Sequence, residues 1–548
     1  MEIDRINDKK FFLLLLLLGL IIYLYGIGGY PLIEPDEGRY SEIPREMLES
    51  GDYNTPKLNY VKYFEKPALF YWMNALSFKV FGENEFAARF PTVLMAILGA
   101  LLTYMITKSI YCHSTALLAP VILLTMILYL GVGQINIIDM TLSFFITLSL
   151  TGFWLKRYWL FYAGMAFAFL AKGLIGIVLP GGIVFWYIIF TRQWFFFKEI
   201  LTSWGGMLLF FAISLPWVIS VCVVNKDFFY FFFIQEHFLR YTTQIHDRYE
   251  PMWFFIPILI LGVVPWVGLL PKSLISIFGI HKIKDEHEKS ALIFFYLWIL
   301  IIFIFFSLSN SKLIPYIAPI FPPLAVIFAS ILNKILDGED LVLAQSVLMW
   351  GAPLFVLIFM ASVIYPFFDK SEISVFRIYF YTIPLGLVSL AFPAIGIYSL
   401  KKKNVRLFVI GMLALSLLFS VTVKRGFVLM GETRSAYDTA RIIFEHKREG
   451  DLVAQIWDYD QGLPFYLKQR IVLIEWLGEL RFGAAQETDP MWFPKSDNIK
   501  EFWENHDRVF FIVHKKNVNR FESLLLSFDI EIPKLLGKDK RNVVYIKY

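Results

Sequence analysis

The chain has 548 residues, of which 57% are hydrophobic and only 18% are charged. An ordinary soluble enzyme carries more charge and less apolar surface, so this composition indicates a membrane protein. The formal net charge of +5 comes from basic residues spread along the chain, a distribution that gives little support to nucleic-acid binding.

A charged lead and a long leucine run open the chain. Because no small-residue cleavage site follows the run, we interpret it as an uncleaved first membrane helix. The later apolar stretches bring the prediction to about thirteen spans, with a margin of one or two near Lys172, where two short ones meet. In chain order, the predicted spans are 12–28, 89–107, 115–133, 136–154, 158–171, 174–191, 204–224, 252–270, 291–308, 313–333, 343–366, 377–399 and 405–423.

Lysine and arginine gather in the loops that share a side with the N-terminus, which predicts a cytoplasmic N-terminus and an external C-terminus. External loops are then expected over 29–88 and 225–251. Several polar features fall on this outer side, including Asp139, Lys172 and Lys312. Such convergence predicts one site at the outer boundary between membrane and water.

The first external loop carries two charged motifs, IEPDEGRY at 33–40 and YFEKP at 63–67. Ionisable side chains at a membrane surface are costly and usually functional, so we expect chemistry here. A short helix is predicted over 39–49, and the alternative is that Asp36 only caps it. A second helix is predicted over 68–80, where Lys66 near the N-terminus would attract phosphate. The alternative for Glu65 and Lys66 is plain solvation.

Two ionisable residues lie in or beside predicted spans. Asp139 is flanked by apolar residues, and a carboxylate there is expensive unless it has a role. It could instead pair with a neighbouring helix for structural reasons. Lys172 stands in the sequence AKG at 171–173 and could snorkel to the interface, as most such lysines do.

The second external loop and the start of the tenth span add further candidates. In EHFLR at 236–240, His237 and Arg240 are three residues apart, on one face of a helix. Arg240 could grip phosphate through its planar guanidinium. His237 is either a metal ligand or a hydrogen-bonded structural residue. In SKLIPY at 311–316, a proline-broken helix start with a lysine suits an anionic headgroup.

After Val423 the hydropathy falls and strands alternate with helices, which predicts a small three-layer α/β domain. The expected strands are 451–457, 471–475, 508–513 and 543–548. The expected helices are 434–449, 498–504 and 518–527.

Taken together, EPDEGRY, YFEKP, Asp139, AKG, EHFLR and SKLIPY resemble the lipid-linked glycosyltransferases of the C superfamily, specifically the aminoarabinose transferase family that modifies lipid A. The resemblance covers nearly the whole chain. It implies a polytopic α-helical membrane domain over 1–424 and a periplasmic α/β domain over 425–548, in the bacterial inner membrane. Protein O-mannosyltransferases share the acidic first loop, so a transferase acting on protein hydroxyls or another glycan is the alternative.

The resemblance implies a role for each matching residue. The catalytic residues would be Asp36, the principal acidic residue of the active site, Asp139, which would help to hold the sugar or acceptor, and Arg39, which would line the same cavity. Glu65 and His237 would hold a divalent metal, zinc, whose catalytic need is left open because two protein ligands make a weak site. The residues that would bind substrate are Tyr40, Lys66, Arg240, Lys172, Lys312 and Tyr316.

The implied donor is undecaprenyl phosphate carrying 4-amino-4-deoxy-L-arabinose, and the implied acceptor is a phosphate of lipid A. Both are amphiphiles, which is consistent with a cavity at the outer leaflet. The partners expected are therefore these two substrates and the surrounding membrane lipid, with the protein acting as a monomer.

Overall fold

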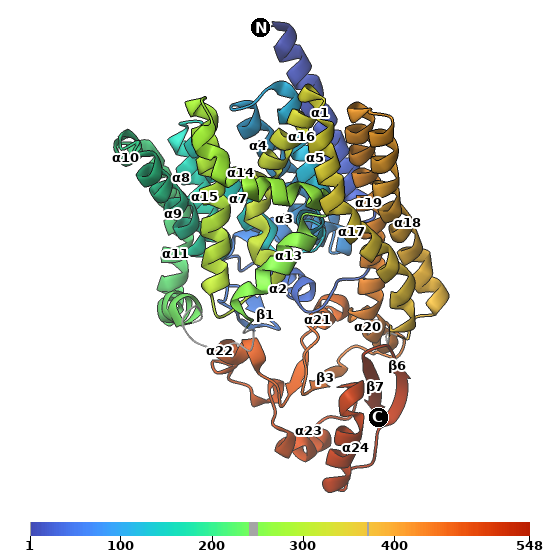
Figure 1. Cartoon of the computed structure of the whole chain (residues 1–548). Coiled ribbons are helices and arrows are strands. Elements are labelled where there is room, and N and C mark those ends of the chain that lie inside the picture. The colour runs from blue at the N-terminus through green and yellow to red at the C-terminus, as the bar shows by residue number, and fades with distance from the viewer. Residues whose placement is uncertain (1, 240–249, 370–371) are drawn as a thin grey trace. The chain divides into compact units, whose positions relative to one another are not determined.

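The computed structural model describes residues 2–239, 250–369 and 372–548, and helices dominate it (Figure 1). The described chain divides into two compact units. The first unit comprises Met1–Ile27, Phe90–Asp369 and Ile373–Gly426, and the second comprises Gly28–Arg89, Lys370–Glu372 and Phe427–Tyr548. The sequence-based boundary at 424 separates the first external loop from the C-terminal domain, whereas the structure groups these two segments in one unit.

The first unit is a helical bundle built from long apolar segments (Figure 1). Its helices, some of which continue into the second unit, are α1 (Glu2–Leu24), α4 (Glu85–Lys108), α5 (His113–Thr125), α6 (Ile127–Val132), α7 (Ile138–Trp154), α8 (Tyr158–Lys172), α9 (Ile175–Thr191), α10 (Phe195–Leu201), α11 (Trp204–Val224), η1 (Tyr230–Leu239), η2 (Met252–Phe254), α13 (Phe255–Gly262), η3 (Trp266–Leu269), α14 (Leu270–Gly279), η4 (Ile280–Lys282), α15 (Glu286–Leu308), η5 (Ile314–Ile320), α16 (Phe321–Gly338), α17 (Leu341–Ile364), η6 (Tyr365–Phe367), α18 (Val375–Lys401) and α19 (Val405–Thr433).

Within the described residues, seven helices are long and apolar enough to cross a membrane, or eight if one bent pair counts as a span. Shorter apolar helices add to them, namely Leu13–Leu24, His113–Thr125, Ile138–Trp154 and Ile175–Thr191. The chain is therefore a multi-pass membrane protein, while the count of about thirteen spans stays a prediction.

Two predicted spans are interrupted. The span expected over 115–133 is split at Met126, whose backbone is extended between α5 and α6. The span expected over 252–270 is broken, because one helix ends at Gly262 and the next one starts at Trp266 after a bend of 115°. Pro265 stands at this bend. A proline has no amide hydrogen to continue a helix, which explains the break.

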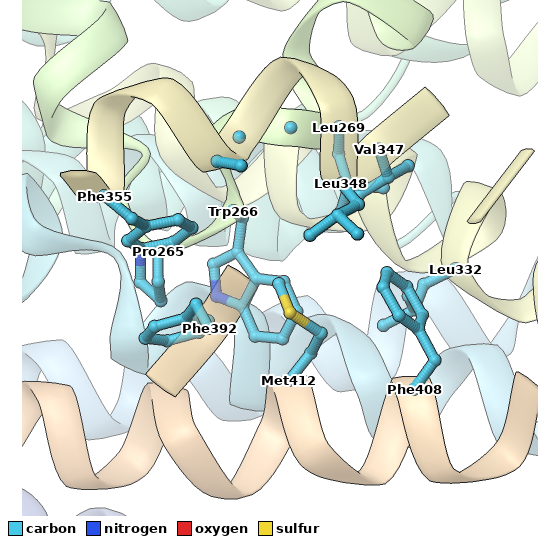
Figure 2. Close-up of a pocket in the computed structure, with 13 residues that line it drawn as sticks. Pro265, Trp266, Leu269, Leu332, Val347, Leu348, Phe355, Phe392, Phe408 and Met412 are labelled. Atoms are coloured by element: carbon cyan, nitrogen blue, oxygen red, sulfur yellow. The ribbon is translucent and has the colours of Figure 1, made fainter. Parts of the chain in front are cut away.

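An apolar pocket lies beside this bend (Figure 2). Trp266 is fully buried there, and its indole nitrogen donates to the Thr125 hydroxyl over 2.9 Å. The rings of Phe355 on α17 and Phe392 on α18 stack with centroids 4.3 Å apart. Since none of the described residues that line the pocket is charged, we interpret it as helix packing.

The second unit begins with the first external loop, which is structured. Helix α2 (Asp36–Ser50) has Asp36 and Glu37 in its first turn, where carboxylates complement the helix dipole. Its N-cap is Pro35, with no side-chain cap bond, so the interpretation of Asp36 as the cap is wrong. A short hairpin of β1 (Lys57–Leu58) and β2 (Val61–Lys62) follows, then α3 (Leu69–Phe81).

The C-terminal part of this unit is a five-stranded sheet with the order β4-β3-β5-β7-β6. Strand β3 runs parallel to β4 and β5, and β7 runs antiparallel to β5 and β6. The elements are α20 (Tyr437–Phe444), β3 (Leu452–Ile456), α21 (Gly462–Leu467), β4 (Val472–Ile474), η7 (Gly478–Leu480), α22 (Arg481–Ala484), η8 (Pro490–Trp492), η9 (Ser496–Asn498), α23 (Ile499–Asn505), β5 (Val509–His514), η10 (Lys515–Asn517), α24 (Val518–Ser527), β6 (Lys534–Lys538) and β7 (Asn542–Lys547).

Helices cover both faces of this sheet, as the three-layer prediction requires. One face packs against α23 and α24 through a core that includes Phe511, Phe521 and Tyr545. The other face carries Asn542, whose amide donates to the Thr439 hydroxyl of α20 over 3.0 Å. The predicted strands and helices are present, while β6 and α21 were not anticipated.

Candidate functional site

The first candidate cluster lies in the second unit, at the start of α2. Asp36 and Arg39 are three residues apart on this helix, which places them on one face. One oxygen of Asp36, Oδ1, lies 3.2 Å from Nη1 of Arg39. The Asp36 side chain is 45% exposed and that of Arg39 only 6%. A solvent-facing carboxylate is therefore held at one oxygen by a buried cation.

The rest of the Arg39 guanidinium is bound by the C-terminal part of the same unit. Nη2 lies 2.9 Å from Oε2 of Glu479, and Nε donates to Oε1 of Glu479 over 3.1 Å and to Oε1 of Gln461 over 2.8 Å. Two nitrogens of one guanidinium on one carboxylate make the fork geometry that arginine favours. Arg39 is thus anchored from outside its own helix.

A buried carboxylate two residues before Asp36 is fixed by the same segment. Glu34 accepts hydrogen bonds from the backbone amides of Gln461 and Gly462 over 3.0 and 2.7 Å. Burial raises the pKa of Glu34, and the nearby carboxyl group of Asp460 adds to this effect.

Glu37 has a structural role in the same motif. Its two carboxylate oxygens accept from Nε and Nη2 of Arg89 over 2.8 and 2.7 Å, and both side chains are fully buried. Breaking such a pair leaves an uncompensated buried charge. Of the two carboxylates in the DEGR segment, Asp36 is exposed and Glu37 stabilises the fold through its buried ion pair with Arg89.

Tyr40, predicted to bind substrate, is buried in an aromatic cluster. Its ring meets Phe70 edge-on at 5.5 Å between centroids and Tyr71 at 6.2 Å. Because only 5% of Tyr40 is exposed, its contact with a substrate stays a prediction.

Glu65 and Lys66 precede α3, in the same unit. Nζ of Lys66 donates to the backbone carbonyl of Glu65 over 2.8 Å, and both residues are partly exposed. This hydrogen bond holds Nζ of Lys66 beside the start of α3. A role for Lys66 in binding phosphate stays a prediction.

The second candidate cluster lies in the first unit, where three predicted residues come together from three helices. Oδ1 of Asp139 on α7 and Nζ of Lys172 on α8 are 2.5 Å apart. The same Nζ lies 4.2 Å from the ring centroid of Tyr316 on η5, a cation–π contact. Asp139 and Lys172 are both 7% exposed. Lys172 is therefore a buried ion-pair partner, and the snorkelling interpretation is wrong.

Lys312 is also buried, four residues before Tyr316. Its Nζ donates to the backbone carbonyl of Ser309 over 2.6 Å and to that of Glu250 over 2.7 Å. These contacts tie the end of the second external loop to the start of η5. A role for Lys312 in binding an anionic headgroup stays a prediction.

Two predicted site residues lie outside the described part of the chain. Arg240 falls in the segment 240–249, and the side chain of His237 is likewise not described, although its backbone belongs to η1. The described residues contain no group of three His, Cys, Asp or Glu side chains that could hold a metal. The zinc expected at Glu65 and His237 stays a prediction.

The structure thus gathers the predicted residues into two clusters, one in each unit. The Asp36 cluster contains Asp36 and Arg39, and the Asp139 cluster contains Asp139, Lys172 and Tyr316. Whether both serve one pocket stays a prediction. Sequence reasoning missed the residues that support Asp36, which are Glu34, Gln461 and Glu479. The residues 461 and 479 stand in no motif, so no local signal could have revealed them.

Two family models match the chain. The model described as dolichyl-phosphate-mannose-protein mannosyltransferase matches residues 65–219, and the aminoarabinose transferase C-terminal domain matches residues 439–546. With the helical bundle and the three-layer C-terminal domain, these matches define the class as a polytopic membrane protein with the glycosyltransferase C-type fold.

Several relatives share the name undecaprenyl phosphate-α-4-amino-4-deoxy-L-arabinose arabinosyl transferase. The protein of that name from Erwinia tasmaniensis is 30% identical over 91% of this chain and 92% of its own length. The second protein of that name from Proteus mirabilis is 34% identical, and the match spans 58% of each chain. The chain therefore belongs to the undecaprenyl phosphate-aminoarabinose arabinosyl transferase family.

A solved structure agrees with this assignment. The crystal structure of ArnT from Cupriavidus metallidurans bound to undecaprenyl phosphate matches 97% of this chain and 97% of its own, with a TM-score of 0.83 and 26% identity. The prediction of the family and of its fold is confirmed, and membership indicates a multi-pass protein of the bacterial inner membrane.

Proposed function

We propose that this chain transfers 4-amino-4-deoxy-L-arabinose from undecaprenyl phosphate to a phosphate group of lipid A at the periplasmic face of the inner membrane. The observation that carries the proposal is the 30% identity to the Erwinia tasmaniensis transferase over 91% of the chain. The likeness to a structure that contains undecaprenyl phosphate supports a lipid-phosphate donor.

The reaction replaces one phosphate by another at the anomeric carbon of the sugar. An oxygen of the acceptor phosphate forms a bond to C1, and the bond from C1 to the donor oxygen breaks. Undecaprenyl phosphate leaves with the electron pair. Because the acceptor phosphate is already anionic, the attack needs no strong general base. Catalysis then depends on positioning and on neutralising the departing phosphate.

Asp36 is the residue that we assign to the sugar. Its side chain is 45% exposed, and only Oδ1 contacts Arg39, so Oδ2 is free to meet a substrate. The amino group of the sugar is an ammonium at neutral pH and would pair with this carboxylate. Asp139 is a weaker candidate, because its Oδ1 already binds Lys172.

Cationic side chains would take the phosphates. Lys66 stands beside the start of α3, where its Nζ donates to the backbone carbonyl of Glu65 over 2.8 Å, and a cation at a helix N-terminus would attract the phosphate of the donor. Arg240, which falls outside the described residues, has a planar guanidinium suited to a bidentate grip. We expect that stabilising the charge that develops on the leaving phosphate makes the largest contribution to the rate.

Transfer to a protein hydroxyl is the second candidate function. It is favoured by the match of residues 65–219 to the protein mannosyltransferase model. A hydroxyl is not anionic, so this reaction needs a general base, which Asp36 could supply. The match of residues 439–546 to the aminoarabinose transferase C-terminal domain favours the lipid A reaction instead.

The proposal can be tested by mass spectrometry of lipid A from cells that lack their own aminoarabinose transferase. Expression of this chain should add the mass of one pentosamine to lipid A, and the Asp36→Asn variant should not. Purified protein should also transfer radiolabelled sugar to lipid A and not to hydroxyl-bearing peptides. Labelled peptide with unchanged lipid A would establish the second function in place of the first.

A further inference from the structure

We propose that Glu479 and Gln461 are positioning residues, which hold Arg39 and thereby set the orientation of the Asp36 carboxylate. The inference rests on the proposed function, in which Asp36 meets the sugar. In this proposal the C-terminal part of the chain contributes to the reaction by fixing the conformation of the first external loop around Asp36.

The contacts leave Arg39 little freedom. Glu479 binds Nε and Nη2 of Arg39 over 3.1 and 2.9 Å, and Gln461 binds Nε over 2.8 Å. The side-chain amide nitrogen of Gln461, Nε2, also donates to Oε1 of Glu479. Gln461 and Glu479, here called the Arg39 clamp, therefore hold each other as well as the guanidinium. Only Nη1 of Arg39 is directed to Asp36.

Charge balance explains why the clamp matters for Asp36. The Arg39 side chain is 6% exposed and that of Glu479 is 14% exposed, so their charges compensate each other away from water. The Arg39 charge is therefore already compensated by Glu479, and Asp36 binds Arg39 through a single oxygen. Without the Glu479 charge, the attraction of Arg39 would fall on Asp36 alone, which would draw both of its oxygens inward.

A second anchor lies on the other side of Asp36. The Glu34 carboxylate accepts from the backbone amides of Gln461 and Gly462 over 3.0 and 2.7 Å. Residues 34 and 39, which flank Asp36, are thus both fixed to the segment 461–462. The short chain between two fixed points cannot rotate freely, so the direction of the Asp36 side chain is set by the C-terminal segment.

The backbones approach too closely for this arrangement to be loose. A β-carbon added at Gly38 would overlap the backbone nitrogen of Gly462, and one added at Gly462 would overlap the carboxylate of Glu34. Glycine is needed at position 38 because a side chain there would meet backbone atoms and separate the two segments. A side chain at position 462 would instead displace the Glu34 carboxylate. The first turn of α2 therefore rests directly on the start of α21.

The test uses the purified full-length chain with undecaprenyl phosphate-linked aminoarabinose and lipid A. In Glu479→Gln the side chain keeps its shape and loses its charge. We expect kcat to fall about 10- to 100-fold, the scale that misplacement of a reacting group produces. The KM for the donor should rise by a smaller factor than kcat falls, because the phosphate of the donor is assigned to other residues. Glu479→Asp, which restores the charge, should recover part of kcat.

A matched control loosens the same region without touching Arg39. Asn59, in the first external loop, exchanges two hydrogen bonds with the backbone of Ile471 over 2.8 and 2.9 Å and is fully buried. Asn59→Ala should lower the melting temperature and leave kcat of the folded protein near the wild-type value. A purely structural role for Glu479 predicts the same behaviour for both variants.

A second measurement is independent of activity. Hydrogen exchange of the amides at 37–40 reports the first turn of α2, where the Arg39 amide donates to the Pro35 carbonyl. Exchange there should accelerate in Glu479→Gln and stay unchanged in Asn59→Ala. Unchanged exchange in Glu479→Gln, or a kcat loss no larger than that of Asn59→Ala, would overturn the clamp. A wild-type chain that transfers no sugar would instead reject the proposed function, while the exchange data still decide on the clamp.

Discussion

Asp139 on α7 and Lys172 on α8 form a buried ion pair, with Oδ1 and Nζ 2.5 Å apart. The pair explains how a carboxylate is tolerated between apolar neighbours, because its charge is compensated by a cation at contact distance. The structure therefore agrees with the alternative that Asp139 pairs with a neighbouring helix, because Lys172 lies on α8.

Asp139→Asn should destabilise the protein by about 3–5 kcal/mol, because Lys172 would be left as an uncompensated buried charge. Thermal unfolding of the purified protein in detergent measures the effect. The double variant Asp139→Asn, Lys172→Met should regain much of the loss, since both charges are then absent. Thr147→Ala on the same helix is the control, because the Thr147 hydroxyl only bonds the Ser143 carbonyl. An unchanged melting temperature in Asp139→Asn would contradict the prediction.

Asp36→Asn should reduce sugar transfer about 100-fold, because the sugar is no longer held in position, and should leave the melting temperature unchanged. The side chain is 45% exposed and makes one contact with Arg39, so its removal costs the fold little. Transfer to lipid A and thermal unfolding are measured on the same preparation. Glu83→Gln is the control, because Glu83 pairs with Lys468 at the surface. Near-normal transfer by Asp36→Asn would remove this residue from the mechanism.

Lys66→Ala should strongly reduce transfer because the departing phosphate loses a cation that we assign to it. Loss of such charge stabilisation costs about 10²- to 10³-fold in kcat. Lys66→Arg should retain a measurable part of the rate, since the charge is kept. Lys57→Ala, which removes a half-exposed lysine 3.9 Å from Asp52, should behave as wild type. Equal rates for Lys66→Ala and Lys57→Ala would reject the assignment.

Protein stability should fall as the pH drops below 6.5, through His514 at the end of β5. Burial lowers the pKa of His514 from its ordinary value of 6.5, and Lys516 adds to this. The unfolded chain then binds the proton more readily than the folded chain. The stability contribution is therefore present above pH 6.5 and is lost as the pH falls toward the pKa of the folded state.

Hydrogen exchange of the β5 amides, corrected for the intrinsic pH effect, measures this change. Protection should decrease in the wild type when the pH is lowered, and His514→Asn should flatten the dependence. The backbone amide of Lys516 donates to Nδ1 of His514 over 3.3 Å, and the asparagine oxygen can accept the same bond. His446→Asn, at an exposed position, serves as the control. An identical pH dependence in His514→Asn would exclude this histidine as the source.

Metal content provides the test of the zinc prediction. Purified protein should contain bound zinc, and both His237→Ala and Glu65→Ala should lose it, because two ligands cannot spare one. Elemental analysis after dialysis measures the ratio of zinc to protein. Stoichiometric zinc in either variant would reject these two residues as the ligands.

The sequence allowed prediction of features that depend on local patterns. The helix expected over 518–527 is α24, Val518–Ser527, because its apolar spacing and its flanks are visible in the sequence. The break near Pro265 was missed, although a proline inside an apolar run signals it. The edge strand β6 was missed because its side chains are mostly exposed, so it lacks the alternation that marks a half-buried strand.

The surroundings of Asp36 could not be predicted in this way. Arg39 lies 422 residues before Gln461 and 440 before Glu479. A polar residue in a loop carries no mark of its distant partner, and pairing at that distance is decided by the tertiary fold. Asp139 and Lys172 were each recognised as unusual, since a charge among apolar residues stands out, but the contact between them was not predicted.

The near-contact between Gly38 and Gly462 also bears on biosynthesis. The loop that holds Asp36 is synthesised and exported early. Gly462, on which the first turn of α2 rests, is synthesised only after the apolar helices of the first unit. Closing such a distant contact is slow, so the nascent enzyme should remain inactive until synthesis is nearly finished. A truncation before residue 461 would then yield an inserted but idle protein.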